Sequence, residues 1–551
     1  MTHQTTPTML DTDVLIVGAG PVGMALALDL RYRGIRFSIL DASDGTVVHP
    51  KVGTVGPRSM ELFRRWGVAG RIRDAGWPGD HPLDIAWVTA VGGHEIHRLP
   101  FGTTDTRPPL PYTPEPEQVC PQHWLSPLLA REVGVHPEGP LRRECRVDGF
   151  RQDPDGVTAW ATDLRTRERM TVRARYLVAC DGASSSLRKA AGIPAPSRHA
   201  TRVFRNILFR APQLRRQLGA RGALVHFLTQ PPALRFPLRS MDGRELYRLT
   251  VAASGHAGNR DLDEDALAMV RAAIAFDTPL QIVSENVWYL THRVARRFRS
   301  GRVLLAGDAA HTLSPSGGFG MNTGICDAAD LGWKLAADLA GWAGPGLLDS
   351  YDTERRPVAE RSLEEANVNL MRTMARELPK EILLNSEDGA RARAELAKEL
   401  ERGGVRGEFE APDVHFGFRY ASDLVVGDGD SDSDSDGDGD GDWRTDAVPG
   451  GRAPHAWLDE GTSTLDLFGQ GFRLLSFTDE PAAPPTALAA LTTAFADRRV
   501  PLGTTRCHDA SVAALYGKPH VLVRPDGHVA WRGTQLPADP GRLADTVRGA
   551  R

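Results

Sequence analysis

The hydrophobic pattern near the N-terminus predicts a strand, a helix and a second strand in close succession. Residues 14–17 are four consecutive apolar residues (Val-Leu-Ile-Val), which is typical of a buried strand. Residues 21–33 are rich in helix-forming leucine, methionine and alanine, and residues 35–40 return to a short apolar run that ends at Asp41. The pattern therefore predicts a strand–helix–strand unit.

Two later apolar runs have the same form, because each predicts a buried strand that stops at a glycine and an aspartate. Residues 176–180 lead into Asp181-Gly182, and residues 301–306 lead into Gly307-Asp308. Upstream of the first run, residues 147–161 and 169–178 read as antiparallel strands with turn signals between them. A long helix is predicted over residues 321–340, because leucines recur there at every fourth position.

The pattern changes character between residues 201 and 287. Short strand-like runs at 203–209, 223–228 and 247–252 alternate with polar turns, and a helix is predicted over 264–276. We interpret this stretch, with parts of 84–120, as a mostly β layer inserted into a domain formed by residues 1–200 and 288–400. A substrate is expected to lie between such a layer and a cofactor.

The C-terminal quarter is predicted to form a separate α/β domain. Residues 427–442 alternate Gly or Ser with eight aspartates; they cannot bury apolar surface and repel one another, so they are expected to be disordered. We assign 401–443 as a linker and 444–551 as the last domain. Strands are predicted there at 472–477, 520–523 and 528–531, with a helix over 488–495.

Composition narrows the class of protein. Of 551 residues, 41% are hydrophobic and 25% charged, as in an ordinary globular protein. No apolar run approaches the roughly 20 residues of a membrane span, and no signal pattern opens the chain. Five scattered cysteines predict reduced thiols in a cytoplasmic protein, and no metal site is expected. Because no basic cluster with aromatic residues is present, nucleic-acid binding is not expected.

Candidate chemistry begins with the turn after the first strand. Gly18, Gly20 and Gly23 form a G-x-G-x-x-G pattern at a predicted strand-to-helix turn, and Asp41 follows at the spacing of a ribose contact. The first glycine permits the turn, the second admits a pyrophosphate, and the third lets the helix pack on the sheet. This unit predicts a dinucleotide but leaves NAD(P) and FAD open.

A second glycine-rich segment, residues 314–324, precedes the long predicted helix. Backbone N–H groups at a helix N-terminus favour a negatively charged ligand. Lys51 and Gln122 are further polar residues at predicted loop or helix-start positions. Each has an ordinary structural alternative, as a solvated charge or a helix cap.

Taken together, three elements resemble the FAD-dependent aromatic hydroxylases, the single-component flavoprotein monooxygenases. They are the glycine unit with Asp41; Cys180-Asp-Gly182 with Ser185 and Arg188; and residues 307–311 (Gly-Asp-Ala-Ala-His) with the 315–324 loop. Residues 351–357 (Tyr-Asp-Thr-Glu-Arg-Arg-Pro) also look like the family. Residues 449–455 and 523–532 resemble the thioredoxin-like domain of its phenol and polyketide hydroxylase branch.

The resemblance implies an α/β fold: a Rossmann-like FAD-binding domain, an inserted mostly β substrate domain and a C-terminal thioredoxin-like domain. The family more often has glutamate where Asp41 stands and asparagine where Asp330 stands. The residues that it implies for cofactor binding are Gly18, Gly20, Pro21, Val22, Gly23, Asp41, Lys51, Gln122, Val147, Asp181, Gly182, Asp308, Pro315, Gly318, Gly320, Met321 and Asn322.

The resemblance also implies an activity. NAD(P)H would reduce FAD, and O2 would then give a flavin C4a-hydroperoxide that hydroxylates a small phenolic or polyketide-type aromatic substrate. Alternatives are another flavin-dependent oxidoreductase, such as a reductase or a Baeyer-Villiger-type oxygenase, and a non-catalytic flavoprotein that binds an aromatic compound. A plain NAD-dependent dehydrogenase is disfavoured by the Asp-Gly and Gly-Asp segments.

The sequence identifies neither a catalytic base nor the oligomeric state, so a homo-oligomer stays open. Polar or aromatic residues of the β layer are the candidate substrate contacts, each with a structural alternative: His226, Arg235, Phe236 and Tyr247.

Overall fold

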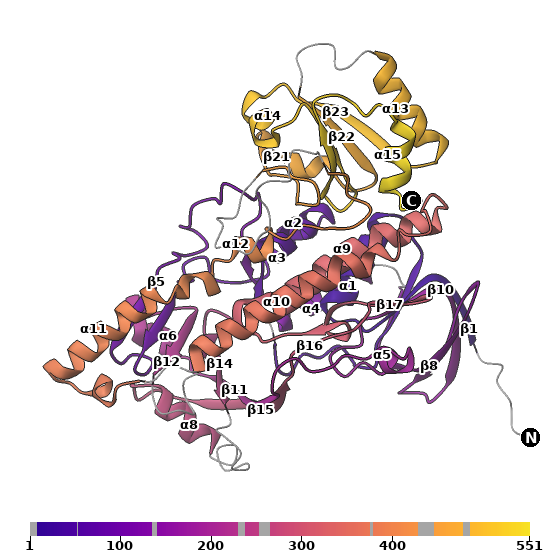
Figure 1. Cartoon of the computed structure of the whole chain (residues 1–551). Helices are drawn as coiled ribbons and strands as arrows, with labels where there is room; N and C mark the ends of the chain where they lie inside the picture. The colour runs from indigo at the N-terminus through magenta and orange to yellow at the C-terminus, as the bar shows by residue number, and fades with distance from the viewer. Residues whose placement is uncertain are drawn as a thin grey trace, which may run out of the picture.

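The computed structural model describes residues 8–51, 53–134, 140–229, 237–252, 265–374, 378–427, 446–477 and 485–551. Two sheets and the long helices α9 and α10 form the body of the molecule, and the C-terminal domain stands on the face that carries α2 and α9 (Figure 1). This confirms the predicted α/β fold of a nucleotide-binding part, an inserted β layer and a terminal α/β domain. The predicted disordered run at 427–442 lies outside the described residues, except for Gly427.

The nucleotide-binding sheet is built around β1 and β10, which are parallel neighbours. The four apolar residues of β1 are fully or almost fully buried. Strand β1 begins at Thr8, six residues before the predicted start. The polar first half of β1 belongs to the strand because the eleven-residue β10 offers it backbone hydrogen-bond partners along its whole length. In spatial order the strands are β17 (Arg299–Ser300), β18 (Val303–Leu305), β10 (Arg169–Ala179), β1 (Thr8–Val17), β2 (Phe37–Leu40) and β7 (Leu141–Arg142), with β8 (Cys145–Asp153) and β9 (Gly156–Asp163) on a branch from β10.

Helices α1 and α9 pack against each other and against this sheet. Helix α1 has Pro21 at its first position, where the missing N–H costs no hydrogen bond, and its apolar residues are buried. The helices of this part are α1 (Pro21–Tyr32), α2 (Pro57–Arg65), α3 (Ala69–Arg73), α4 (Gln122–Val133), α5 (Ser186–Ala190), α9 (Phe319–Leu339) and α10 (Ser350–Met374). Two-stranded ladders join β3 (Thr54–Val55) to β6 (Gln118–Val119) and β16 (Arg293–Val294) to β19 (His311–Thr312).

The second sheet is mostly antiparallel and has two different faces. One face packs under α6 (Leu214–Leu218) and α8 (Ala266–Ala273), and we call it the outer face. The other, the inner face, packs against α11 (Glu387–Arg402) and against the 49–54 loop of the nucleotide-binding part. The strand order is β15 (Gln281–Leu290), β11 (Arg202–Arg210), β14 (Leu246–Ala252), β13 (Pro237–Ser240), β12 (Val225–Leu228), β4 (Ile85–Val88) and β5 (Glu95–Leu99).

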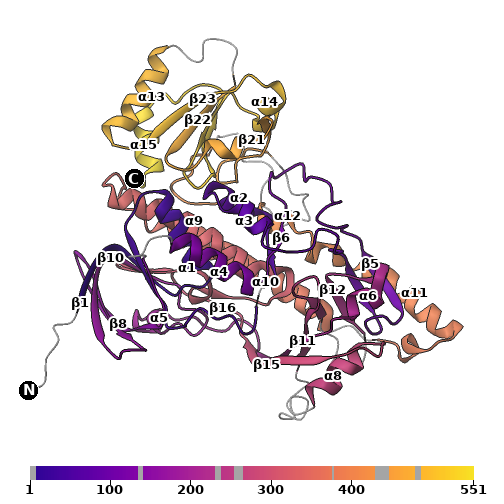
Figure 2. The ribbon, with the colours of Figure 1, turned by 180° about the vertical axis from the view of Figure 1, so that it is seen from behind.

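The C-terminal domain is a four-stranded sheet between helices, and its predicted strands are present. Strand β22 is parallel to β23 and antiparallel to β24, a mixed order that fits the predicted thioredoxin-like domain. The view from behind shows the same domain above α2 and α9 (Figure 2). Its elements are β22 (Phe472–Ser476), α13 (Pro485–Asp497), β23 (Leu502–Arg506), α14 (Ala510–Tyr516), β24 (His520–Val523), β25 (Val529–Gly533) and α15 (Pro540–Val547), preceded by α12 (Pro412–His415), β20 (Trp457–Asp459) and β21 (Thr462–Ser463).

Among the helices of the described residues, none combines the length and apolar character that a membrane span requires.

Candidate active site

The glycine turn after β1 is packed on two sides and open on the third. A Cβ atom on Gly18, whose φ is +105°, would lie 2.3 Å from the Cys180 carbonyl oxygen, and one on Gly23 would lie 2.0 Å from the Gly18 carbonyl oxygen. On Gly20 it would meet no atom within 4 Å. The first and third glycines therefore close the turn, while the second faces free space at the N-terminus of α1.

Asp41 lies at the end of β2 beside this turn. Its carboxylate accepts hydrogen bonds from the backbone N–H groups of Ala19 and, at 2.7 Å, Ser43. Arg143 is 3.6 Å away and also contributes positive charge. The acid that the sequence singled out is thus held next to the glycine turn, in the position from which it could reach a ribose.

The remaining predicted contacts of the nucleotide end lie on neighbouring elements. The Gln122 side-chain carbonyl accepts a hydrogen bond of 2.9 Å from the Lys51 backbone N–H, so the start of α4 and the exposed Lys51 are joined. Val147 is buried on β8, which pairs with β9 on the branch from β10. Val22 packs on two further glycines: a Cβ on Gly307 or Gly324 would come within 3 Å of its side chain.

The Asp181-Gly182 segment and Asp308 end the other two strands at the same edge of the sheet. Asp181 accepts hydrogen bonds from Ser185 Oγ at 2.5 Å and from the Leu187 backbone N–H at 3.2 Å, and so fixes the start of α5. Gly182 has φ +83° and open space where a Cβ would lie. The Asp308 side chain is exposed after β18.

The 315–324 loop makes the N-terminus of α9, as the sequence predicted. Pro315 leads into Gly317 and Gly318, both with positive φ, and a Cβ on Gly318 or on Gly320 would meet no atom within 4 Å. The Asn322 side chain accepts from the Gly56 backbone N–H at 2.8 Å and donates to the Gly318 carbonyl at 2.8 Å. That side chain therefore holds the loop, and the backbone of Gly320 and Met321 is left at the open end of the helix.

These observations fit FAD. Four glycine positions on three segments, Gly20, Gly182, Gly318 and Gly320, have free space where another residue would place a side chain. The N-termini of α1 and α9 offer two sets of backbone donors for anionic groups. A cofactor with a pyrophosphate at one end and a ring that gains negative charge on reduction at the other matches this cradle.

A buried ion network supports the edge of the cradle at Gly307. Asp327 accepts hydrogen bonds from His311 Nε2 at 2.7 Å, Arg355 Nε at 2.8 Å and the Gly307 backbone N–H at 3.2 Å. Burial raises the pKa of Asp327, but the charges of His311 and Arg355 outweigh it, so the pKa lies below its usual range. Asp327 on α9 therefore joins two segments that resemble the family in sequence, residues 307–311 after β18 and residues 351–357 on α10.

The inner face of the second sheet carries two adjacent arginines. Arg239 on β13 and Arg248 on β14 are directly paired across the strands. Arg239 donates to Thr54 Oγ1 at 2.7 Å, and Arg248 donates to the Pro50 carbonyl at 2.6 Å, so both reach the 49–54 loop. Neither forms an ion pair with a carboxylate of the described residues, and both Nε atoms are buried without a hydrogen-bond partner.

Both guanidinium groups are electrostatically strained. Burial, and for Arg239 also the charge of Arg248, lowers the pKa of Arg239 to about 9. Burial lowers the pKa of Arg248 to about 10. Like charges directly opposite in a sheet repel each other, so this pair is suited to an anionic group between the sheet and the cofactor. Sequence reasoning missed both residues; the signal was a single arginine inside each of two short apolar runs.

The predicted substrate contacts lie elsewhere. His226 and Tyr247 alternate onto the outer face, under α6 and α8, where burial lowers the pKa of His226 to about 4 and Tyr247 stacks on Phe209. We therefore correct these two assignments: both side chains point away from the cofactor cradle. Arg235 and Phe236 lie outside the described residues. On the inner face, Phe227 stacks on Trp87 with ring centroids 5.3 Å apart.

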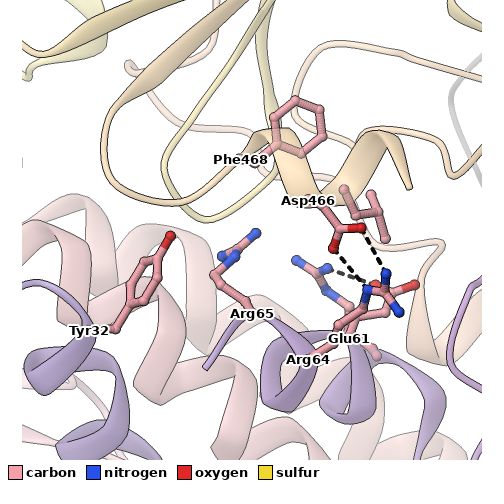
Figure 3. Close-up of a pocket in the computed structure, with 8 residues that line it drawn as sticks. Tyr32, Glu61, Arg64, Arg65, Asp466 and Phe468 are labelled. Carbon is pink, nitrogen blue, oxygen red and sulfur yellow. Dashed lines mark hydrogen bonds and ion pairs between the residues drawn. The ribbon is translucent and has the colours of Figure 1, made fainter. Parts of the chain in front are cut away.

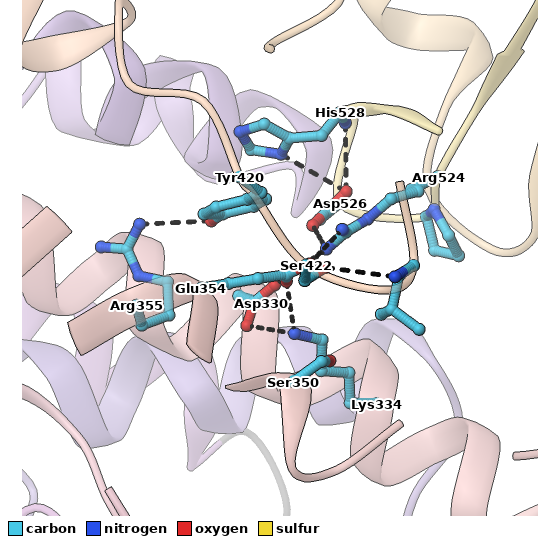
Figure 4. A network of polar contacts seen from close by, with 12 residues as sticks. Asp330, Lys334, Ser350, Glu354, Arg355, Tyr420, Ser422, Arg524, Asp526 and His528 are labelled. Atoms are coloured by element: carbon cyan, nitrogen blue, oxygen red, sulfur yellow. Dashed lines mark hydrogen bonds and ion pairs between the residues drawn. The ribbon is translucent and has the colours of Figure 1, made fainter. Parts of the chain in front are cut away.

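A second buried network joins the nucleotide-binding part to the C-terminal domain (Figure 4). Arg524, from the turn after β24, donates to both oxygens of Glu354, at 2.6 and 2.8 Å, and to Asp330 at 3.1 Å. Lys334 donates to the same two carboxyls, at 2.6 and 2.8 Å. Asp526 completes the cluster, 2.6 Å from Arg524. All five side chains are almost completely buried.

The cluster thus contains three carboxyl groups and two cations, and protonation of Asp330 balances the charge. Burial, together with Glu354 and Asp526, raises the pKa of Asp330 to about 8 against the opposing effect of Lys334 and Arg524. Burial therefore favours the protonated, neutral form of Asp330 near pH 7. A protonated carboxyl and an amide have the same charge, so asparagine is the matched substitution at this position.

Asp330 makes stability depend on pH. Its folded-state pKa of about 8 exceeds the value of about 3.9 for an unfolded chain. The contribution of Asp330 to the free energy of unfolding is therefore fully present below about pH 4 and is lost as the pH rises to about 8. We expect Asp330→Asn to remove this dependence, so that the unfolding free energy of wild type relative to the variant falls by about 1 kcal/mol per unit between pH 5 and 7. Thermal unfolding across this range measures it; parallel pH profiles would contradict the assignment.

Comparison with known proteins adds two family models that together cover most of the chain. A model described as "FAD binding domain" matches residues 11–366. A model described as "Aromatic-ring hydroxylase, C-terminal" matches residues 446–550.

Solved structures and curated proteins match over almost the full length. The rebeccamycin biosynthetic enzyme RebC with reduced flavin is 60% identical, with a TM-score of 0.93 over 99% of this chain and 100% of that one. RebC soaked with chromopyrrolic acid and holding 7-carboxy-K252c gives the same values. Aklavinone-11 hydroxylase with FAD and aklavinone is 28% identical, with a TM-score of 0.82 over 98% and 99%. Tetracenomycin B2 monooxygenase-dioxygenase of Streptomyces olivaceus is 32% identical over 98% of both chains.

Proposed function

This chain belongs to the FAD-dependent aromatic-ring hydroxylases, and we propose that its own substrate is a polycyclic aromatic compound that carries a carboxylate. The family assignment makes it an FAD-dependent monooxygenase of aromatic compounds. The predicted cofactor and reaction type are therefore confirmed. The substrate class goes beyond the family and needs a feature of this chain.

The observation that supports the carboxylate is the Arg239–Arg248 pair. Two buried cations stand side by side with no carboxylate of the described residues to balance them. Leaving buried charged donors without partners is costly, so a ligand that supplies a carboxylate gains affinity there. RebC binds 7-carboxy-K252c when soaked with chromopyrrolic acid; one compound is named as an acid and the other as a carboxy compound.

Different residues would act at the cofactor end and at the substrate end of the site. The glycine turn and Asp41 would hold the nucleotide end of FAD, and the N-terminus of α9 would stabilise negative charge on its ring. FAD, when reduced, supplies the chemistry by which one oxygen atom of O2 enters an aromatic ring. The arginine pair would fix the substrate, while the stacked Trp87 and Phe227 line the apolar inner face and help to exclude water.

We further propose NAD(P)H as the electron donor and O2 as the second substrate. Their support is the family assignment and the sequence, which has no second G-x-G-x-x-G unit for a resident nicotinamide. NAD(P)H would then bind transiently. Oxygen uptake with a product heavier by one oxygen atom would separate hydroxylation from a reductase or from a protein that only binds an aromatic compound.

Two ligands that differ by one carboxyl test the substrate proposal. We expect the FAD-loaded enzyme to bind 7-carboxy-K252c more tightly than K252c. Arg239→Met and Arg248→Met should each weaken binding of the carboxylated ligand at least 30-fold, because removing one partner of a buried charge pair costs about 2 kcal/mol or more. Binding of K252c should change little. Fluorescence titration measures the affinity of each of the three proteins for each of the two ligands.

Arg210→Met is the matched control, since Arg210 is an exposed residue of β11 that pairs with Glu245. It should leave both affinities unchanged. Equal losses for the two ligands in the arginine variants, or no loss for either, would contradict the proposed role of the pair.

A further inference from the structure

A small cavity lies between the nucleotide-binding part and the C-terminal domain. Its volume is about 130 Å³. Helices α1 and α2 form its floor, and the helical turn η7 (Thr464–Leu467) with the residue after it forms its roof (Figure 3). The lining residues are Tyr32, Arg58, Glu61, Arg64, Arg65, Leu465, Asp466 and Phe468.

Both carboxylates of the lining are already fully used. Glu61 accepts hydrogen bonds from Arg58 at 2.9 Å and from Arg452 at 2.9 Å. Asp466 accepts two from Arg64, each of 2.8 Å, and one from the Ser463 backbone N–H. Three arginines therefore face two carboxylates whose oxygens are engaged, and the lining keeps one positive charge in excess.

Arg65 carries this excess charge. It donates only to backbone carbonyls, those of Pro525 at 3.2 Å and Asp526 at 3.4 Å, and it forms no ion pair with a carboxylate of the described residues. Burial and the nearby charges of Arg58 and Arg33 lower its pKa to about 10. Figure 3 shows its side chain between Tyr32 and the Arg64–Asp466 pair, directed from α2 toward the C-terminal domain.

Two donors of the lining have no partner among the described residues. The Nε atoms of Arg58 and Arg65 are buried and make no hydrogen bond there. The two residues are seven positions apart on α2, which is two helical turns, so both lie on the face that lines the cavity. A buried guanidinium N–H without an acceptor is unfavourable, and an acceptor in the cavity would remove the penalty.

We propose that this cavity binds a small tetrahedral oxyanion of the phosphate class, which links the two domains. The space corresponds to about four water molecules at roughly 30 Å³ each, which accommodates an anion of five heavy atoms and excludes a nucleotide. Guanidinium groups bind such oxyanions through charge-assisted hydrogen bonds. The anion neutralises Arg65 inside the domain interface and so stabilises the docked C-terminal domain.

The test is a calorimetric titration of FAD-loaded protein with sodium phosphate, in chloride buffer at constant ionic strength. FAD fills its own phosphate-binding turn, so that site does not contribute. We expect one saturable site per chain, and Arg65→Gln should weaken phosphate binding at least tenfold. Arg71→Gln is the matched control, because it removes one exposed positive charge on the adjacent helix α3 without touching the cavity. It should leave the affinity unchanged.

Two further measurements keep the proposal falsifiable. Arg239→Gln should not alter phosphate binding; if it does while Arg65→Gln does not, the anion sits among the substrate arginines and the proposal is wrong. If Arg65→Gln fails to fold, hydrogen exchange of wild type decides, because phosphate should slow exchange of residues 464–468 relative to chloride. Absence of saturable binding would show that water alone fills the cavity and would overturn the proposal.

Discussion

Replacing Gly20 with valine is expected to give a folded protein that purifies without FAD. A Cβ at this position meets no protein atom within 4 Å, so the fold has room for the larger side chain. That same space lies at the N-terminus of α1, where we propose that the FAD pyrophosphate binds. Valine would therefore exclude the cofactor rather than disrupt the core, and FAD affinity should fall by about 100-fold or more, a loss of about 2.7 kcal/mol.

The ratio of absorbance at 450 nm to that at 280 nm measures the loss, and circular dichroism checks folding. Gly407→Val is the matched control: it introduces the same side chain at an exposed glycine with no atom within 4 Å, away from the cradle. It should stay yellow. Gly23→Ala should behave differently from both, because its Cβ would lie 2.0 Å from a backbone oxygen and would destabilise the turn itself. A yellow, active Gly20→Val protein would refute the placement of the pyrophosphate.

Replacing Arg524 with methionine is expected to destabilise the chain by about 3–5 kcal/mol and to loosen the C-terminal domain. Arg524 is completely buried and pairs with Glu354, Asp330 and Asp526. Without it, Glu354 and Asp526 would each lose a buried cationic partner. Removing one partner of a buried ion cluster leaves uncompensated charge, which costs far more than the cluster contributes in net stability.

Calorimetry should show a lower unfolding temperature for the C-terminal domain, and limited proteolysis should cleave it sooner. Arg498→Met offers the comparison, because Arg498 lies in the same domain but forms a partly exposed pair with Asp545. A pair of that kind contributes less than about 1 kcal/mol. Equal effects of the two substitutions would mean that the interdomain cluster carries no special share of the stability.

The cofactor end of the site could be predicted from the sequence because the residues of its motif lie close together in the chain. Gly18, Gly20 and Gly23 lie within six residues, and Asp41 follows one helix and one strand later, so each part of the unit fixes the meaning of the others. The structure adds which glycines pack against protein atoms, Gly18 and Gly23, and which one has free space beside it, Gly20. That distinction depends on the Cys180 carbonyl, which directly follows β10 about 160 residues along the chain and cannot be read from the motif.

The substrate contacts could not be predicted from the sequence, and the reason is a different one. The predicted strands were present, but which side chain faces the cofactor depends on register and on which face the helices cover. A shift of one residue exchanges the two faces of a strand. His226 and Tyr247, which their polar chemistry predicts as substrate contacts, lie on the outer face, whereas Arg239 and Arg248 lie on the inner one.

By itself, the sequence determined the α/β fold, the family and FAD as the cofactor, and it predicted the residues of the cradle, because strand, turn and helix signals arise from residues close together in the chain. Only the tertiary structure decided how distant charges are balanced. Arg524 meets Glu354, burial favours a proton on Asp330, and Arg65 is left without a carboxylate, through contacts between residues up to 461 positions apart. The energy of a buried charge depends on every neighbour in space, and the order of residues along the chain does not contain that information.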